Sequence, residues 1–287
     1  MDGLLIINKE ENMTSRDVVN SVCKKLNTKK VGHTGTLDPM AKGVLVVAVN
    51  KALKIVDELT MLDKEYISEV TLGISTDTLD ITGNILEKRK PRNIDKKEIE
   101  DVIKSFKGPY NMEVPKYSAI KVNGKKLYEY ARNNEEVELP VKKVYINDIE
   151  LIDGITYNED TITFKFRCNV SKGTYIRSLI RDICKKLGEI GTMSDLIRTK
   201  QGNFSIENSI KLSEINENTK LICIKDSIEI PTIEVDDFLH NKISHGSKLE
   251  NRYEYDKIGF VYEDKLIAIY IVDPNDKSKI KPKKVLL

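Results

Sequence analysis

A glycine-punctuated loop leads directly into the longest apolar run of the chain. The loop is residues 32–43, GHTGTLDPMAKG, and the run is Val44–Val49. The run is too short to cross a bilayer, which takes about 20 apolar residues, so we expect a buried strand. Glycine allows the loop a tight path, and Pro39 keeps Asp38 out of the helical region. The chain therefore presents Asp38 on a constrained loop at the entrance to a rigid strand.

Asp38 is the candidate chemical group of this loop. Its basic neighbours in the sequence are Lys29, Lys30, His33 and Lys42. A carboxylate among cations stays ionised and can act as a nucleophile or a base. The structural alternative is an ordinary Asp-Pro turn. A KH-type clamp at residues 32–35 is excluded because Pro39 interrupts the helix that must follow, and a P-loop is excluded because no Gly-Lys-Ser/Thr follows.

Length and composition favour a two-domain protein with a sizeable core. The 287 residues are 40% hydrophobic and 32% charged, with a net charge of +2. Four widely spread cysteines without a C-x-x-C pair predict reduced thiols, and His240 and His245 lack companion ligands for a zinc site. The N-terminus has no signal-peptide pattern, so we expect a cytoplasmic protein. We place a domain boundary near residues 228–232, inside the acidic segment 206–237.

Hydrophobic periodicity predicts both helices and strands. We expect helices at 15–26, 95–106 and 174–187, the first opened by a capping box at Thr14 and Asp17. Strands are expected at 44–49, 65–72, 117–122, 143–152, 161–170, 258–262 and 266–272. Arg177 falls in the first turn of its helix, where the dipole disfavours a cation, which indicates a carboxylate or phosphate partner.

Basic residues are segregated along the chain despite the small net charge. The segment 116–132 holds five cations and three tyrosines: Lys116, Lys121, Lys125, Lys126, Arg132, Tyr117, Tyr128 and Tyr130. Cations meet phosphates and rings offer stacking faces, so the pattern is typical of a nucleic-acid contact. A solvated surface hairpin is the alternative.

The loop string GHTGTLDPMAKGVL resembles the signature of the tRNA pseudouridine-55 synthases of the TruB family. Further family motifs follow in order: Lys64-Glu65-Tyr66, residues 76–83, residues 117–124, residues 171–179 and Leu196-x-Arg198-Thr199. Residues 9–15, KEENMTS, lack the Pro and Gly that the family carries there. The resemblance is strong over residues 2–205 and weak over 231–287, which resemble a small PUA-type domain.

The resemblance implies an α+β protein whose catalytic domain, residues 1–229, has a mixed, largely antiparallel sheet. Residues 112–140 would form a basic RNA-binding flap, and residues 230–287 a β-rich PUA-like RNA-binding domain. The implied reaction converts uridine 55 in the TΨC loop of tRNA into pseudouridine after base flipping. It implies no cofactor, no metal, no membrane, no guide RNA or obligatory protein partner, and a monomer.

The resemblance also implies roles for individual residues. Asp38 would be the nucleophile or base, Arg177 its pairing partner, and Tyr66 a ring that stacks on uracil and moves a proton. His33 would fill the space that the flipped base leaves, and Tyr175 and Leu196 would line the pocket. RNA contacts are implied for Lys9, Lys121, Lys125, Lys126 and Arg132. Ordinary packing or surface positions are the alternatives, and Asp77 and Asp80 are interpreted as a loop-shaping cluster rather than a catalytic pair.

Two rival functions use the same features. The archaeal and eukaryotic guide-RNA-dependent branch shares the aspartate motif but generally carries longer terminal extensions. A non-catalytic tRNA-folding chaperone would use the same basic surface without a nucleophile. Pseudouridine formation by the purified chain alone discriminates between them.

Overall fold

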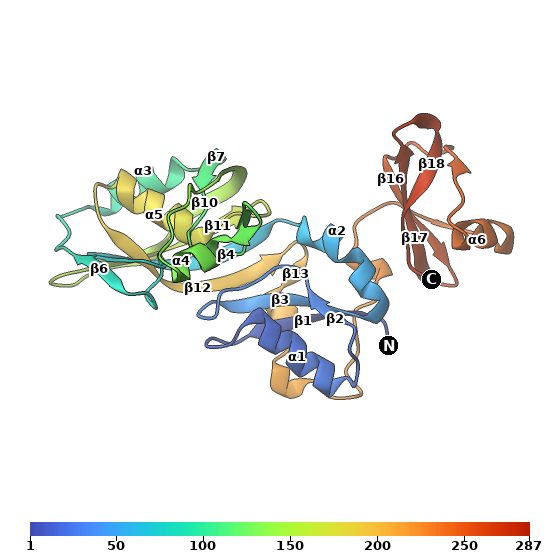
Figure 1. Ribbon diagram of the computed structural model, residues 1–287, viewed down its shortest axis with the longest axis horizontal. Helices are drawn as coiled ribbons and strands as arrows, with labels where there is room; N and C mark the ends of the chain where they lie inside the picture. Colours follow the sequence, from blue (N-terminus) through green and yellow to red (C-terminus); the bar gives the residue numbers. More distant parts are fainter.

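The computed structural model describes residues 1–287, except for the side chain of Asp153. Its main sheet curves through the larger part of the molecule, and a second sheet lies at one end (Figure 1). Along the main sheet the strands are β1 (Gly3–Lys9), β3 (Lys42–Val49), β12 (Gly191–Gln201), β4 (Lys64–Leu72), β11 (Ile162–Val170), β10 (Val141–Tyr157) and β7 (Gly108–Glu113). Two short strands, β2 (Val31–His33) and β13 (Phe204–Ser205), pair with β3 and β12.

This sheet is mixed and largely antiparallel, as predicted. Among its described strands, β3 and β12 run parallel, and the other neighbours run antiparallel. The backbones of β3 and β12 approach closely at Gly43, which has a φ of 99°. A Cβ at Gly43 would lie 2.2 Å from the carbonyl oxygen of Arg198. Only glycine fits this position, which explains the last glycine of the loop.

The predicted helices are confirmed to within two residues at nearly every end. They are α1 (Ser15–Lys25), α3 (Lys96–Lys104) and α5 (Ile176–Lys186), and shorter helical segments are η1 (Asn50–Ile55), α2 (Val56–Thr60), α4 (Leu127–Arg132) and α6 (Asp237–Ser244). The side chain of Thr14 accepts a hydrogen bond from Asp17 N, and Asp17 accepts one from Thr14 N, so the predicted capping box is present. The remaining 3-10 turns are η2 (Ile206–Asn208), η3 (Leu212–Glu214) and η4 (Lys225–Ser227).

The strand predicted at 117–122 is wrong over most of its length. Only β8 (Lys121–Val122) is extended, paired with β9 (Lys125–Lys126). The carbonyl of Tyr117 accepts from Arg177, and that of Ser118 accepts from Tyr128 N. These contacts replace a strand ladder. The turn between β8 and β9 is as predicted, with Asn123 and Gly124 at φ of 51° and 83°.

The other predicted strands are present, but several strands of both sheets were not predicted. Strand β4 alternates buried and half-buried residues, and β10 extends beyond its predicted end with a register shift against β11. In the main sheet, β1, β7 and β12 were not predicted, and neither were the short strands β2 and β13, although β1 pairs with the buried strand β3. A second small hairpin comprises β5 (Ile74–Thr76) and β6 (Ile85–Lys88). Among the described residues, no helix is long and apolar enough to span a membrane.

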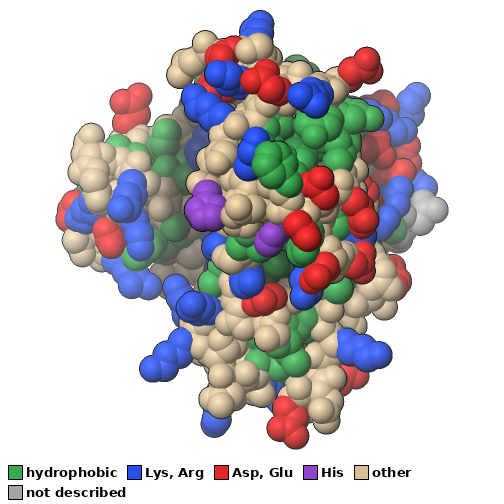
Figure 2. Space-filling model, turned by 90° about the vertical axis from the view of Figure 1, so that its right-hand side faces the viewer, with side chains coloured by type: hydrophobic (Ala, Val, Ile, Leu, Met, Phe, Trp, Pro, Cys, Tyr) green, Lys and Arg blue, Asp and Glu red, His purple; other side chains and the backbone are tan. Residues whose placement is uncertain are grey.

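The C-terminal sheet begins at β14 (Thr232–Glu234), after the predicted boundary. Its strands lie in the order β14, β16 (Lys257–Tyr262), β17 (Lys265–Asp273), β18 (Asp276–Val285) and β15 (Leu249–Glu250). Figure 2 views the molecule from this end, where Lys and Arg side chains are interspersed with Asp and Glu side chains. This face therefore does not form a uniformly basic field.

The two sheets share a hydrophobic core. One cluster of buried residues joins Leu4, Ile6, Val44, Val46, Ala48, Ala52, Ile55, Leu59 and Phe204 to Val261, Leu266, Ile269 and Leu286 of the C-terminal domain. A domain connected only by a flexible linker would not contribute buried side chains to the hydrophobic core of the other domain. The C-terminal domain is therefore part of the packing that supports β1 and β3.

This shared core predicts the effect of a change at the C-terminus. Leu286→Ala removes a side chain that is 3% exposed, so the free energy of unfolding should fall by about 2–4 kcal/mol. Leu287→Ala is the control, because Leu287 is 44% exposed, and should change it by less than about 0.5 kcal/mol. Urea unfolding measures both values. Equal small effects would show that the two domains do not share a core.

Candidate active site

A cavity of about 760 Å³ opens beside the loop that carries Asp38. It lies between the ends of β4 and β12, the start of α5 and the segment before β8. Five residues predicted from the sequence line it together: Asp38, Tyr66, Tyr175, Arg177 and Leu196. The fold thus brings residues from distant parts of the chain to one place.

The central contact joins Asp38 to Arg177. Arg177 Nε lies 2.9 Å from Asp38 Oδ2. The arginine side chain is 6% exposed, whereas the aspartate side chain is 35% exposed. The guanidinium is therefore a buried support, and the carboxylate stays open to the cavity. A carboxylate fixed by a charge-assisted hydrogen bond and still accessible can attack or accept a proton.

The other nitrogens of Arg177 hold two further loops. Nη1 donates to the carbonyl of Thr78 at 3.0 Å, and Nη2 donates to the carbonyl of Tyr117 at 3.1 Å. Asp80 Oδ2 lies 3.9 Å from Nη1. The cation in the first turn of α5 thus has carboxylate partners, as the helix-dipole argument predicted.

Asp77 and Asp80 shape the loop between β5 and β6. Asp80 Oδ1 accepts from Thr82 N at 3.1 Å, and Asp77 Oδ1 accepts from Asn84 N at 2.8 Å. This confirms the loop-shaping interpretation. The sequence did not indicate that Asp80 also lies near Arg177.

Lys9 occupies a different place from the one expected. It is 0% exposed, and its Nζ donates to the carbonyls of Glu10, Met13 and Pro39 at 2.9, 2.7 and 3.1 Å. Burial lowers its pKa to about 8, while the charge of Asp38 acts in the opposite direction. The expected RNA contact is therefore wrong, because Lys9 lies beneath the Asp38 loop and supports it.

His33 ends β2 and lies outside the residues that line the cavity. Burial, with the charges of Arg198 and Arg16, lowers the pKa of His33 below its ordinary value, so the ring is neutral at pH 7. Its Nδ1 is buried without a hydrogen-bond partner among the described residues. The ring adjoins the Asp38 loop, and its role toward RNA stays a prediction.

Two buried cations line the cavity without having been assigned a role. Arg198 Nε donates to the carbonyl of Val44 at 2.6 Å, and its Nη2 donates to that of Gly35 at 3.1 Å. Lys64 Nζ donates to the carbonyls of Thr60 and Leu62, and burial lowers its pKa to about 8. Both belong to motifs quoted from the sequence, Lys64-Glu65-Tyr66 and Leu196-x-Arg198-Thr199, which is the signal that could have found them.

The predicted RNA-binding cations lie on the basic hairpin, which comprises β8, β9 and the adjoining α4, and not in the lining of the cavity. Lys125 forms an ion pair with Glu135 at 2.6 Å, and Lys126 Nζ donates to the hydroxyl of Tyr128 at 3.3 Å. The guanidinium of Arg132 lies over the ring of Tyr128, 5.3 Å from its centroid. Tyr128 reaches the cavity wall, whereas the four predicted cations of the hairpin, Lys121, Lys125, Lys126 and Arg132, are not among the lining residues. Apart from Arg177, the cations that line it were not predicted as site residues: Lys64, Lys142, Lys143, Lys172 and Arg198.

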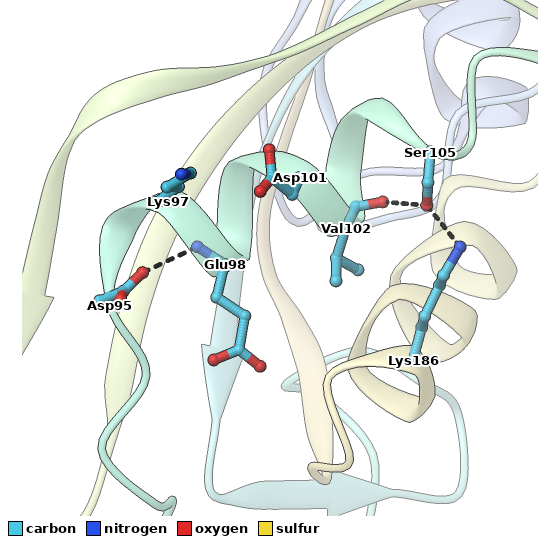
Figure 3. Close-up of a pocket in the computed structure, with 7 residues that line it drawn as sticks. All are labelled: Asp95, Lys97, Glu98, Asp101, Val102, Ser105 and Lys186. Carbon is cyan, nitrogen blue, oxygen red and sulfur yellow. Dashed lines mark hydrogen bonds between the residues drawn. The ribbon is translucent and has the colours of Figure 1, made fainter.

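A second hollow, of about 450 Å³, lies between α3 and α5 (Figure 3). Asp95 accepts from Glu98 N at 2.8 Å and caps α3, while Lys186 Nζ donates to Ser105 Oγ at 2.6 Å. We assign this hollow to helix packing, because the contact between Lys186 and Ser105 joins α5 to the end of α3. Among the described residues, no group of His, Cys, Asp or Glu side chains could hold a metal ion.

Known proteins share both the sequence and the fold of this chain. A family model described as TruB family pseudouridylate synthase (N terminal domain) matches residues 23–176. tRNA pseudouridine synthase B of Bacillus pumilus (strain SAFR-032) is 40% identical, covering 100% of this chain and 98% of that protein. The same enzyme of Staphylococcus aureus (strain MSSA476) is 42% identical, covering 99% of both.

Solved structures share the fold. A chain of a Cbf5-Nop10-Gar1 complex is 25% identical with a TM-score of 0.74, covering 99% of this chain and 85% of that chain. A chain of an H/ACA RNP bound to a substrate RNA containing 2'-deoxyuridine is 23% identical with a TM-score of 0.71, with the same coverage.

The position of Lys9 yields a stability prediction. Lys9→Met keeps the length of the side chain but leaves three carbonyls without their donor, so the free energy of unfolding should fall by about 2–4 kcal/mol. Lys29→Met, in an exposed loop, is the matched control. Denaturant unfolding of both variants is the measurement. A decrease no larger than that of the control would mean that Lys9 does not support the loop.

Proposed function

Since the chain belongs to the TruB family of pseudouridylate synthases, we propose that it converts uridine 55 in the TΨC loop of tRNA into pseudouridine. The observation that carries this proposal is the pairing of Asp38 with a buried Arg177 at the floor of an open cavity. The reaction breaks the N-glycosidic bond, turns the uracil and forms a C–C bond to the same ribose. Reactant and product are isomers.

The cavity suits a nucleotide taken out of its stack. Its volume lies within the range of about 300–1,000 Å³ that is usual for small-molecule sites. Tyr66 is 7% exposed and Leu196 is 5% exposed, so both offer rigid apolar surface to a flipped base. Burial raises the pKa of Tyr175, so its phenol stays protonated. Contacts of this kind offset the few kcal/mol that unstacking costs.

Asp38 is the group that acts on the sugar or the base. Its carboxylate enters the reaction charged and oriented, because Arg177 fixes one oxygen and leaves the side chain accessible. Tyr66 is the proposed partner for the uracil ring and for proton movement during the rearrangement. Both roles require the substrate to enter the cavity beside the start of α5.

We propose that the chain binds the tRNA directly, as a monomer in the cytoplasm. Lys142, Lys143 and Lys172 at the cavity wall offer charge for the phosphates beside the flipped base. The segment 112–140 is proposed to close over the stem-loop as a flap, and His33 to fill the gap in the stack. Full-length similarity to stand-alone synthases supports action without a guide RNA, whereas the similarity to guide-RNA complexes concerns the fold.

The catalytic assignment is tested by Asp38→Asn. The amide has nearly the volume of the carboxylate but neither attacks nor accepts a proton at neutral pH, so pseudouridine formation should fall to background. Binding of tRNA should be unchanged, because the phosphate contacts lie elsewhere. The variant should still fold, because Arg177 keeps the carbonyls of Thr78 and Tyr117 and the nearby Asp80 as partners. Asp160→Asn, in an exposed turn, is the matched control. Site-resolved mapping of position 55 on unmodified tRNA measures the product. Near-normal turnover by the Asp38 variant would refute the catalytic assignment. If the wild type itself formed no pseudouridine, the alternative of a tRNA-folding chaperone without catalysis would be favoured.

The flap is tested by salt dependence. Changing Lys121, Lys125, Lys126 and Arg132 to Ala should weaken tRNA binding and reduce the log–log salt slope by up to about 0.9 for each phosphate that the variant no longer neutralises. Lys97→Ala with Lys104→Ala on α3 serves as the control. Binding isotherms at several salt concentrations give the slopes. An unchanged slope would make the hairpin an ordinary solvated surface.

A further inference from the structure

The C-terminal domain holds helix α2 through a buried carboxylate. Glu58 of α2 is 9% exposed and forms hydrogen-bonded ion pairs with Lys257 of β16 and Lys283 of β18. Burial raises the pKa of Glu58, but the two lysines outweigh it, so its pKa lies below the ordinary value. Lys284 also pairs with Asp57 of α2 at 2.9 Å, although Asp57 is exposed. We call these contacts the α2 clamp.

The other end of α2 faces the candidate active site. The carbonyl of Leu59 accepts from Gln201 Nε2 at 3.0 Å, and the carbonyl of Thr60 accepts from Lys64 Nζ at 2.8 Å. Thr60 and Lys64 both line the cavity. One short helix thus contacts the C-terminal domain on one side and the cavity wall on the other.

Gln201, the last residue of β12, continues this connection to the Asp38 loop. It is 0% exposed, and the same Nε2 donates to Thr34 Oγ1 at 2.6 Å. Thr34 is itself buried, lines the cavity and precedes Asp38 by four residues. Gln201 therefore joins α2 directly to the segment that carries the reactive carboxylate.

Packing alone does not explain a buried amide at Gln201, because an apolar side chain would be more favourable there. Its Oε1 is buried without a hydrogen-bond partner among the described residues. A buried acceptor left unpaired costs about 1–3 kcal/mol, which a Leu or Met of similar volume would avoid. An apolar residue could not donate the two hydrogen bonds that Gln201 makes to the Leu59 carbonyl and to Thr34 Oγ1.

We propose that Gln201 is a positioning residue that ties the Asp38 loop to α2, and that the C-terminal domain acts through the α2 clamp on the rate of the reaction. This inference rests on the proposed function. It gives the C-terminal domain a part in kcat in addition to any part in RNA affinity. A residue that holds the reactive group in place affects turnover at saturating substrate, because small misplacements are costly in rate.

The test is a double-mutant cycle between Gln201→Met and Glu58→Met. Gln201→Met keeps the volume and removes both hydrogen bonds, and Glu58→Met opens the clamp while Lys257 and Lys283 remain free to reach water. Each variant should lower the single-turnover rate at saturating unmodified tRNA by about tenfold or more, with the Kd for tRNA changed less than about twofold. Because the two residues act in one chain of contacts, the double variant should be no slower than the slower single variant. Lys279→Met, which removes only an exposed pair with Asp276, is the control and should keep the wild-type rate.

Hydrogen exchange of the peptide covering residues 33–38 gives a second readout. Exchange should rise in both variants and stay unchanged in Lys279→Met. Normal rates, effects confined to Kd, or multiplicative effects in the double variant would overturn the proposal. If Gln201→Met does not fold, Glu58→Met alone decides through its rate and its exchange. A wild-type chain that forms no pseudouridine would refute the proposed function, and the exchange data would then still show whether the clamp positions the loop.

Discussion

A buried guanidinium at the start of α5 is the constraint on which the site depends. Taking a charge out of water costs several kcal/mol unless every polar contact is replaced. Arg177 replaces them with the carboxylate of Asp38 and the carbonyls of Thr78 and Tyr117, which come from three separate loops. Because the same cation satisfies all three, the Asp38 carboxylate, the β5–β6 loop and the segment at Tyr117 are held in one arrangement.

The sequence predicted correctly those features that depend on interactions between neighbouring residues. The capping box of α1, the turn at Asn123 and Gly124, and the buried strand after the Asp38 loop all depend on nearby residues, and the structure has each of them. The partner of Arg177 was also predictable, because a cation in a first helical turn needs a compensating charge. The identity of that partner as Asp38 came from the family resemblance.

The errors concern contacts that join distant segments. Lys9 looks like a surface cation in the sequence, yet the carbonyls that bury it include that of Pro39, thirty residues away. Residues 117–122 precede the Asn123-Gly124 turn and were predicted as a strand, but the carbonyls of Tyr117 and Ser118 accept from Arg177 and α4 instead of a neighbouring strand. The core shared by β1, β3 and the C-terminal sheet likewise depends on tertiary packing, which no short motif reports. The unused signal was the motif Leu196-x-Arg198-Thr199, which was quoted without a role for Arg198.

The central proposal is that Arg177 orients Asp38 for the reaction, and it starts from their ion pair. The most direct test is the single-turnover rate of pseudouridine formation at position 55, with saturating unmodified tRNA, for the wild type and for Arg177→Met. We expect the variant to be slower by at least about 10²-fold, since the carboxylate loses its orientation, while the Kd for tRNA stays within about threefold. A rate within a few-fold of the wild type, in a variant that folds and binds normally, would show that Arg177 does not position Asp38.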